Sequence, residues 1–150
     1  MTDTELTLKS KDGLTLMGRE WTPAAAPRGA VCLVHGIGEH VGRYSHVAAA
    51  LTQAGYAMLG YALRGHGRSE GERVSVERYD DFLDDLDAFL ARVSERNPGR
   101  PVFLLGHSMG GGVVASYLVA RKPELAGVIF SGPAVPGGRP PGANAVAFDT

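Results

Sequence analysis

Ser108 stands at the centre of the pentapeptide GHSMG, which runs from Gly106 to Gly110. The residues before it, 101–105 (PVFLL), favour a buried strand, and residues 109–121 favour a helix. Flanking glycines let the backbone bend tightly at such a junction, so the serine is presented as a nucleophile for a carbonyl carbon. The alternative is a chance occurrence of G-x-S-x-G, but the strand and helix around it favour the nucleophile.

A second motif, HGIG, directly follows another apolar run. Loops at the carboxyl ends of parallel strands line one crevice, so this motif and Ser108 should meet. The backbone N–H groups of Ile37 and Met109 would then form an oxyanion hole, because Gly36 and Gly38 can adopt the backbone angles that turn the Ile37 N–H inward. A plain glycine turn is the alternative for this loop.

Other site chemistries find little support. The sequence has no C-x-x-C or H-E-x-x-H metal motif, and its glycine-rich stretches lack the spacing of phosphate-binding loops. Neither a metal nor a cofactor is therefore expected. Five aspartates fall in one amphipathic segment, where a solvated helix face is the ordinary explanation; they are Asp80, Asp81, Asp84, Asp85 and Asp87.

Strand and helix patterns alternate along the chain. Alternating residues at 3–9 and 14–21 predict an antiparallel hairpin, and later apolar runs predict strands covered on both faces. This order predicts an α/β chain with a mainly parallel sheet. The later strands are expected at 30–34, 56–61, 101–105 and 125–131, the helices at 44–54, 76–97 and 109–121, and a Pro/Gly-rich loop or tail at 133–150.

Composition excludes several classes of protein. The chain has 150 residues, about one domain, with 15 Lys and Arg against 16 Asp and Glu, so it has no strong field to attract nucleic acid. Cys32 lies in an apolar run and is expected to be a buried core residue. No stretch approaches the ~20 apolar residues of a membrane span, so a cytoplasmic location is the default. Transient contact with a lipid surface stays open.

Three stretches together resemble the monoacylglycerol lipase and lysophospholipase branch (serine aminopeptidase S33 type) of the α/β-hydrolases. They are residues 35–44 (HGIGEHVGRY), 64–71 (RGHGRSEG) and 106–111 (GHSMGG). The resemblance implies an α/β-hydrolase core over residues 1–132 and an acyl-enzyme hydrolase of monoacylglycerol-like or lysophospholipid-like carboxylic esters. Carried over by position, it implies Ser108 as nucleophile and Ile37 and Met109 as oxyanion donors, supported by His35, Gly36, Gly38, Gly106 and Gly110.

One position departs from this pattern. The family usually has an acidic residue two positions before the arginine of the middle stretch, whereas this chain has Ala62, which leaves open how that loop is anchored. Arg64, His66 and Arg68 are interpreted as parts of a structural loop, not as catalytic groups.

The chain does not supply a complete catalytic triad in the family's order, in which the acid and the histidine follow the serine. All five histidines precede Ser108, and the only acidic residues after it are Glu124 and Asp149. The chain is therefore interpreted as an N-terminal half that stops after about the sixth strand, without the cap and the C-terminal core. A truncated gene, a fragment and a frame-shifted product all remain open.

Two functions remain from different classes. The first is an ester hydrolase that is active only when a longer chain or a second half supplies the acid and base. The second is a non-catalytic α/β module that acts through association. Because the truncation would leave the sixth strand as an uncovered apolar edge, poor solubility or self-association of the chain is expected.

Overall fold

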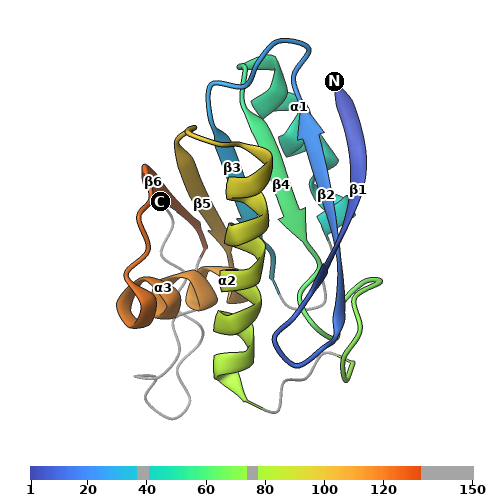
Figure 1. Ribbon diagram of the computed structural model, residues 1–150, viewed down its shortest axis with the longest axis vertical. Helices are drawn as coiled ribbons and strands as arrows, with labels where there is room; N and C mark the ends of the chain where they lie inside the picture. Colours follow the sequence, from blue (N-terminus) through green and yellow to red (C-terminus); the bar gives the residue numbers. More distant parts are fainter. Residues whose placement is uncertain (37–40, 74–77, 133–150) are drawn as a thin grey trace.

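The computed structural model describes residues 1–36, 41–73 and 78–132, and Figure 1 shows how their elements are arranged. Strands dominate the N-terminal part, and strands then alternate with helices. The elements are β1 (Thr2–Lys9), β2 (Thr15–Thr22), β3 (Ala30–Val34), the 3₁₀ helix η1 (Val41–Tyr44), α1 (Ser45–Gln53), β4 (Ala57–Tyr61), α2 (Tyr79–Arg96), β5 (Val102–His107), α3 (Met109–Arg121) and β6 (Gly127–Ser131).

The strands form one sheet in the order β1-β2-β4-β3-β5-β6. β2 pairs antiparallel with both β1 and β4, while β4, β3, β5 and β6 run parallel. Every residue of β3 and β4 is buried, as expected for apolar strands at the centre of a sheet. The prediction of a mostly parallel sheet with an antiparallel N-terminal hairpin is confirmed.

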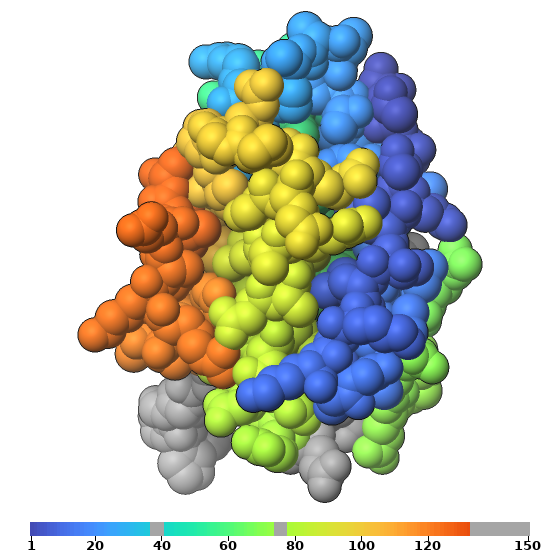
Figure 2. Space-filling view, in the orientation of Figure 1, coloured from blue at the N-terminus to red at the C-terminus, as the bar shows by residue number. Residues whose placement is uncertain are grey.

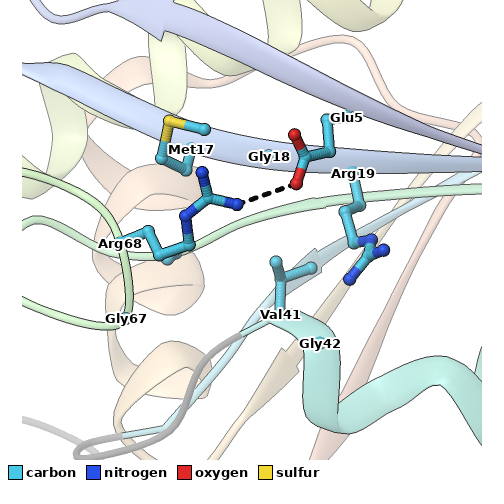
Figure 3. A pocket seen from close by; sticks show the side chains of 9 residues that line it. Glu5, Met17, Gly18, Arg19, Val41, Gly42, Gly67 and Arg68 are labelled. Atoms are coloured by element: carbon cyan, nitrogen blue, oxygen red, sulfur yellow. Dashed lines mark hydrogen bonds and ion pairs between the residues drawn. The ribbon is translucent and has the colours of Figure 1, made fainter.

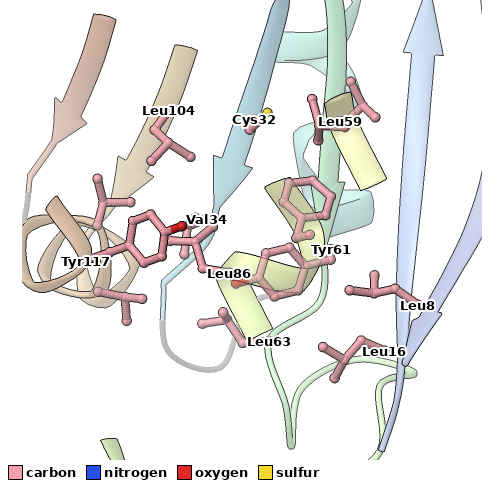
Figure 4. Close-up of a cluster of buried hydrophobic side chains, with 14 of the residues drawn as sticks. Leu8, Leu16, Cys32, Val34, Leu59, Tyr61, Leu63, Leu86, Leu104 and Tyr117 are labelled. Atoms are coloured by element: carbon pink, nitrogen blue, oxygen red, sulfur yellow. The ribbon is translucent and has the colours of Figure 1, made fainter. Parts of the chain in front are cut away.

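Helices cover both faces of this sheet. On one face, α2 and α3 pack on a large apolar cluster that includes Tyr61, Leu86 and Leu104 (Figure 4). On the other face, Ala48 of α1 packs with Trp21 in a smaller cluster. Figure 2 shows α2 crossing the middle of the first face, between the N-terminal hairpin and α3.

The sequence pattern located most elements to within a few residues. The 3₁₀ helix η1 was not predicted; it brings Val41 against β4, where a Cβ on Gly60 would clash with the Val41 Cγ2. The helix predicted from residue 76 begins instead at Tyr79, because Arg78 before it has the extended backbone of an N-cap residue. Residues 74–77 lie outside the described part of the chain. The predicted tail at 133–150 also lies outside it.

The lengths and compositions of the helices bear on whether the chain could span a membrane. Among the helices of the described residues, none is both long and apolar enough to cross a membrane.

Candidate active site

Ser108 lies at the junction of β5 and α3, with φ 52° and ψ −119°. These angles match the first central position of a type II′ turn, a conformation that favours glycine. The Ser108 N–H donates to the Ser131 carbonyl at 3.0 Å, and the Ser108 carbonyl accepts from the Gly111 N–H, also at 3.0 Å. A strand ladder on one side and a helix start on the other therefore hold this serine in a strained conformation, at the tight bend that the pentapeptide predicts.

The two glycines of the pentapeptide allow strand and helix to approach closely. A Cβ on Gly106 would lie 2.8 Å from the Gly111 Cα and 2.9 Å from the Gly110 carbonyl oxygen. A Cβ on Gly110 would overlap the carbonyl oxygens of Val34 and His35. Both contacts are with backbone atoms, which cannot swing aside as a flexible side chain can. These positions therefore require glycine.

The HGIG loop begins beside the serine. Val34, the last residue of β3, is paired in register with Gly106 of β5, so the segments that follow the two strands start as neighbours. His35 is fully buried, and its Nε2 accepts the Leu63 N–H at 2.8 Å. The proton is therefore on Nδ1, which donates to the Gly36 carbonyl at 2.7 Å. His35 thus ties the start of this loop to the segment after β4.

The oxyanion donors are described only in part. Met109 is the first residue of α3, so its N–H has no acceptor within the helix. The helix dipole adds positive potential at the same end. Ile37 and Gly38 lie outside the described residues, so the second predicted donor remains a prediction.

Arg64 and His66 make hydrogen bonds and packing contacts with other residues of the protein. The Arg64 guanidinium makes two hydrogen bonds to Asp85, from Nε at 2.7 Å and from Nη2 at 2.8 Å. It also contacts Asp12 at 2.9 and 3.1 Å. His66 is buried, its Nδ1 lies 3.1 Å from the Arg64 carbonyl oxygen, and its ring packs edge-on against His35 at 5.3 Å. These contacts agree with the interpretation of this segment as a structural loop.

The ion pairs of Arg64 shift the acidities around it. Hydrogen bonds from Arg64, and then from Ser10, hold the pKa of Asp12 well below its usual range. Burial raises the pKa of Asp85, and the bonds from Arg64 offset part of that effect. The bonds to Asp85 in turn raise the pKa of Arg64, which stays protonated.

One expectation for the aspartates of α2 was wrong. Asp85 does not lie on a solvated face but is completely buried. It follows Phe82 by three residues and precedes Phe89 by four, so it lies on the apolar side of the helix. The doubly hydrogen-bonded guanidinium of Arg64 makes this burial tolerable. Its spacing from these two phenylalanines was the feature of the sequence that could have placed Asp85 on the buried side of the helix.

The loop after β4 is anchored without an acidic side chain at position 62. The Ser69 hydroxyl donates to the Ala62 carbonyl at 2.6 Å and accepts the Met17 N–H at 2.9 Å. The Ala62 N–H donates to the Met17 carbonyl at 2.8 Å. Ser69 therefore ties this loop to β2, which answers the question that Ala62 raised.

Sequence reasoning missed Ser131, at the end of β6. Its carbonyl accepts the Ser108 N–H, and its hydroxyl lies 3.1 Å from Nδ1 of His107. The His107 ring also packs near Tyr44, with the ring centres 6.4 Å apart. Within the described residues no histidine hydrogen-bonds the Ser108 side chain, and no cluster of possible metal ligands occurs.

The family model described as serine aminopeptidase, S33, matches residues 25–148. This match covers most of the chain, including Ser108 and both predicted oxyanion segments. The chain belongs to the serine aminopeptidase S33 family. Its fold and its strand–serine–helix junction are those expected of this α/β-hydrolase family.

The proteins to which the chain is similar include lipases and an esterase. The chain is 43% identical over 125 residues to the monoacylglycerol lipase of Mycolicibacterium smegmatis, covering 82% of this chain and 44% of that protein. A solved Bacillus coagulans carboxyl esterase, in complex with glycerol, superposes with a TM-score of 0.80 at 30% identity, covering 88% and 44%. A soluble variant of Saccharomyces cerevisiae monoglyceride lipase, bound to a substrate analog, gives a TM-score of 0.77 at 30% identity, covering 89% and 46%.

Length distinguishes this S33 chain from these three relatives. The chain spans less than half the length of each of them.

Proposed function

We propose that this chain carries the nucleophile and oxyanion part of a serine ester hydrolase. The observation that supports this most is Ser108, kept at φ 52° between β5 and α3 by backbone contacts that only glycine allows. Such a conformation costs about 1–3 kcal/mol and is expected where a serine must be presented for reaction.

The proposed reaction proceeds through an acyl-enzyme. The Ser108 Oγ attacks the ester carbonyl carbon while a histidine takes its proton, and the carbonyl oxygen gains negative charge near the N–H groups of Met109 and Ile37. The alcohol leaves after it receives the proton, and water then hydrolyses the acyl-serine. No histidine follows Ser108 among the 150 residues. We therefore propose that further chain, or a separate second half, supplies the acid and base.

The proposed substrates are monoacylglycerol-like or lysophospholipid-like esters. The names of the bacterial and yeast relatives support the first of these. Transient contact with a lipid surface would suit such substrates, and this contact and a cytoplasmic location remain predictions.

A hydrolysis assay with an extended chain tests this proposal. The 150 residues are joined to the segment of the M. smegmatis relative that follows the matched region, and 1-monoacylglycerol is compared with triacylglycerol. We expect glycerol release from the monoester that Ser108→Ala abolishes. The 150-residue chain alone should be slower by about 10⁶-fold, because it lacks the base. A folded extended chain that hydrolyses neither ester would contradict the proposal.

The second candidate function is a non-catalytic module that acts through association. It is favoured by β6, which ends the sheet and leaves Ile129 45% exposed. Absence of hydrolysis by the extended chain, together with a stable complex between copies of the 150-residue chain, would favour this function.

A further inference from the structure

A hollow of about 310 Å³ lies where η1 and the loop after β4 meet the N-terminal hairpin (Figure 3). Its apolar lining comes from Met17, Val41 and Ala62. Its charged lining comes from Glu5 and Arg19, which are cross-strand partners in β1 and β2, and from Arg68. The volume is at the lower end of the range of about 300–1,000 Å³ that is typical of small-molecule sites.

The apolar wall is firmly held. Val41 and Ala62 are 7% and 2% exposed, and the Val41 side chain packs directly over Gly60. The backbone N–H and carbonyl of Met17 are both hydrogen-bonded, to the Ser69 hydroxyl and the Ala62 N–H. The fold therefore fixes the backbone of this wall.

The charged lining offers spare hydrogen-bond donors. Each guanidinium group has one carboxylate partner: Arg68 Nη1 donates to Glu5 Oε1 at 2.8 Å, and Arg19 Nε donates to Asp3 at 3.1 Å. A guanidinium has five N–H donors, and these contacts use one from each arginine. The side chains of Arg68 and Glu5 are 72% and 57% exposed, so an incoming anion can reach this pair.

We propose that this hollow binds a single-chain amphiphile with an anionic head group. The head contacts the guanidinium groups of Arg68 and Arg19, and a short- to medium-length chain lies on Met17, Val41 and Ala62. The lining contains no residue of the β5–α3 junction, so this site is separate from Ser108 and does not depend on the proposed hydrolase activity.

Calorimetric titration of the 150-residue chain tests the proposal. Octanoate and octyl phosphate are the anionic probes, and 1-octanol is the uncharged control of equal chain length. We expect at least one anion to bind about tenfold more tightly than octanol, because a charge-assisted contact of this kind contributes about 1.4 kcal/mol. The stronger of the two anions then identifies the head group as carboxylate or phosphate.

Two substitutions that should change the binding affinity in opposite directions locate the site. Arg68→Gln should weaken binding about tenfold, since it removes one guanidinium. Glu5→Gln should strengthen binding a few-fold, because it releases Arg68 from its carboxylate partner, a result that lost folding cannot produce. Met17→Trp should fill the hollow and prevent binding. Arg92→Gln, which is distant from the hollow, and Ser108→Ala are controls that should leave the affinity unchanged. Equal binding of octanol and both anions, loss of binding in Ser108→Ala, or no response to Arg68→Gln and Glu5→Gln would overturn the proposal.

Discussion

At the scale of single residues, Ser108 and Arg64 show two different ways in which the chain holds an unfavourable arrangement. Ser108 keeps a backbone conformation that favours glycine, fixed by the ladder to β6 and the start of α3. Arg64 lies buried at 6% exposure, and its charge is balanced by Asp85 and Asp12. Each arrangement gives a stability prediction.

Replacing Ser108 should distinguish backbone strain from side-chain effects. Ser108→Gly is expected to unfold with a free energy about 1 kcal/mol higher than that of Ser108→Ala, because glycine adopts φ 52° without the strain of a Cβ. Urea unfolding of the two variants measures the difference. An alanine variant as stable as the glycine variant would show that the junction is not strained.

Asp12 gives a prediction about pH. Arg64 lowers the pKa of Asp12 in the folded chain, so the contribution of Asp12 to stability is complete above its unfolded pKa of about 3.9 and is lost as the pH falls below that value. Because Asp12 is half exposed, Asp12→Asn should lower the free energy of unfolding by only about 1 kcal/mol at pH 7.

The comparison of Asp12→Asn with the parent chain should be made at several pH values. The difference is expected to shrink steadily below about pH 4. A difference that stays constant from pH 7 to pH 3 would argue against the ion pair with Arg64.

At the scale of elements, the close approach of β5 and α3 to the end of β3 depends on glycine. Gly110→Ala would place a Cβ on the carbonyl oxygens of Val34 and His35, so we expect a loss of about 3 kcal/mol or more in unfolding free energy. Val119→Ala in the same helix is the matched control, since Val119 is 78% exposed and should change stability little. Equal effects of the two substitutions on thermal unfolding would contradict the close packing.

The sequence predicted local features at this scale better than distant ones. The apolar runs located β3 and β4, and the spacing of Phe82, Leu86 and Phe89 located the buried side of α2. The pattern could not show that β4 lies between β2 and β3, because strand order depends on contacts between distant parts of the chain.

In the candidate site, too, local features could be predicted from the sequence and contacts between distant residues could not. Ser108, Gly106 and Gly110 could be predicted because the turn itself restricts which residues fit. The hydrogen bonds from the Ser108 N–H to the Ser131 carbonyl and from Arg64 to Asp85 could not be predicted, since they join residues that the fold brings together.

At the scale of the whole molecule, the sheet of the described residues has two edge strands, β1 and β6, and β6 is the apolar one. β6 is the last strand in the order, its residues are half-buried or exposed, and Ile129 is 45% exposed. We expect the chain to self-associate as its concentration rises, because an apolar edge strand offers unpaired backbone groups to another copy.

Sedimentation velocity checks this association. Ile129→Lys should shift the chain toward monomer, since a charged side chain opposes pairing at an edge. Val119→Lys, on exposed helix surface, is the control and should leave association unchanged. A parent chain that stays monomeric at every concentration would rule out association through β6.

We propose Ser108 as the nucleophile of an S33-like ester hydrolase. Covalent labelling with a fluorophosphonate, located by peptide mass spectrometry, tests it most directly in the folded extended chain that carries the later segment of the M. smegmatis relative. We expect a label on Ser108, none in Ser108→Ala, and labelling of the 150-residue chain alone that is slower by about 10³-fold or more. A label on a different serine, or no label on Ser108 in the extended chain, would contradict it.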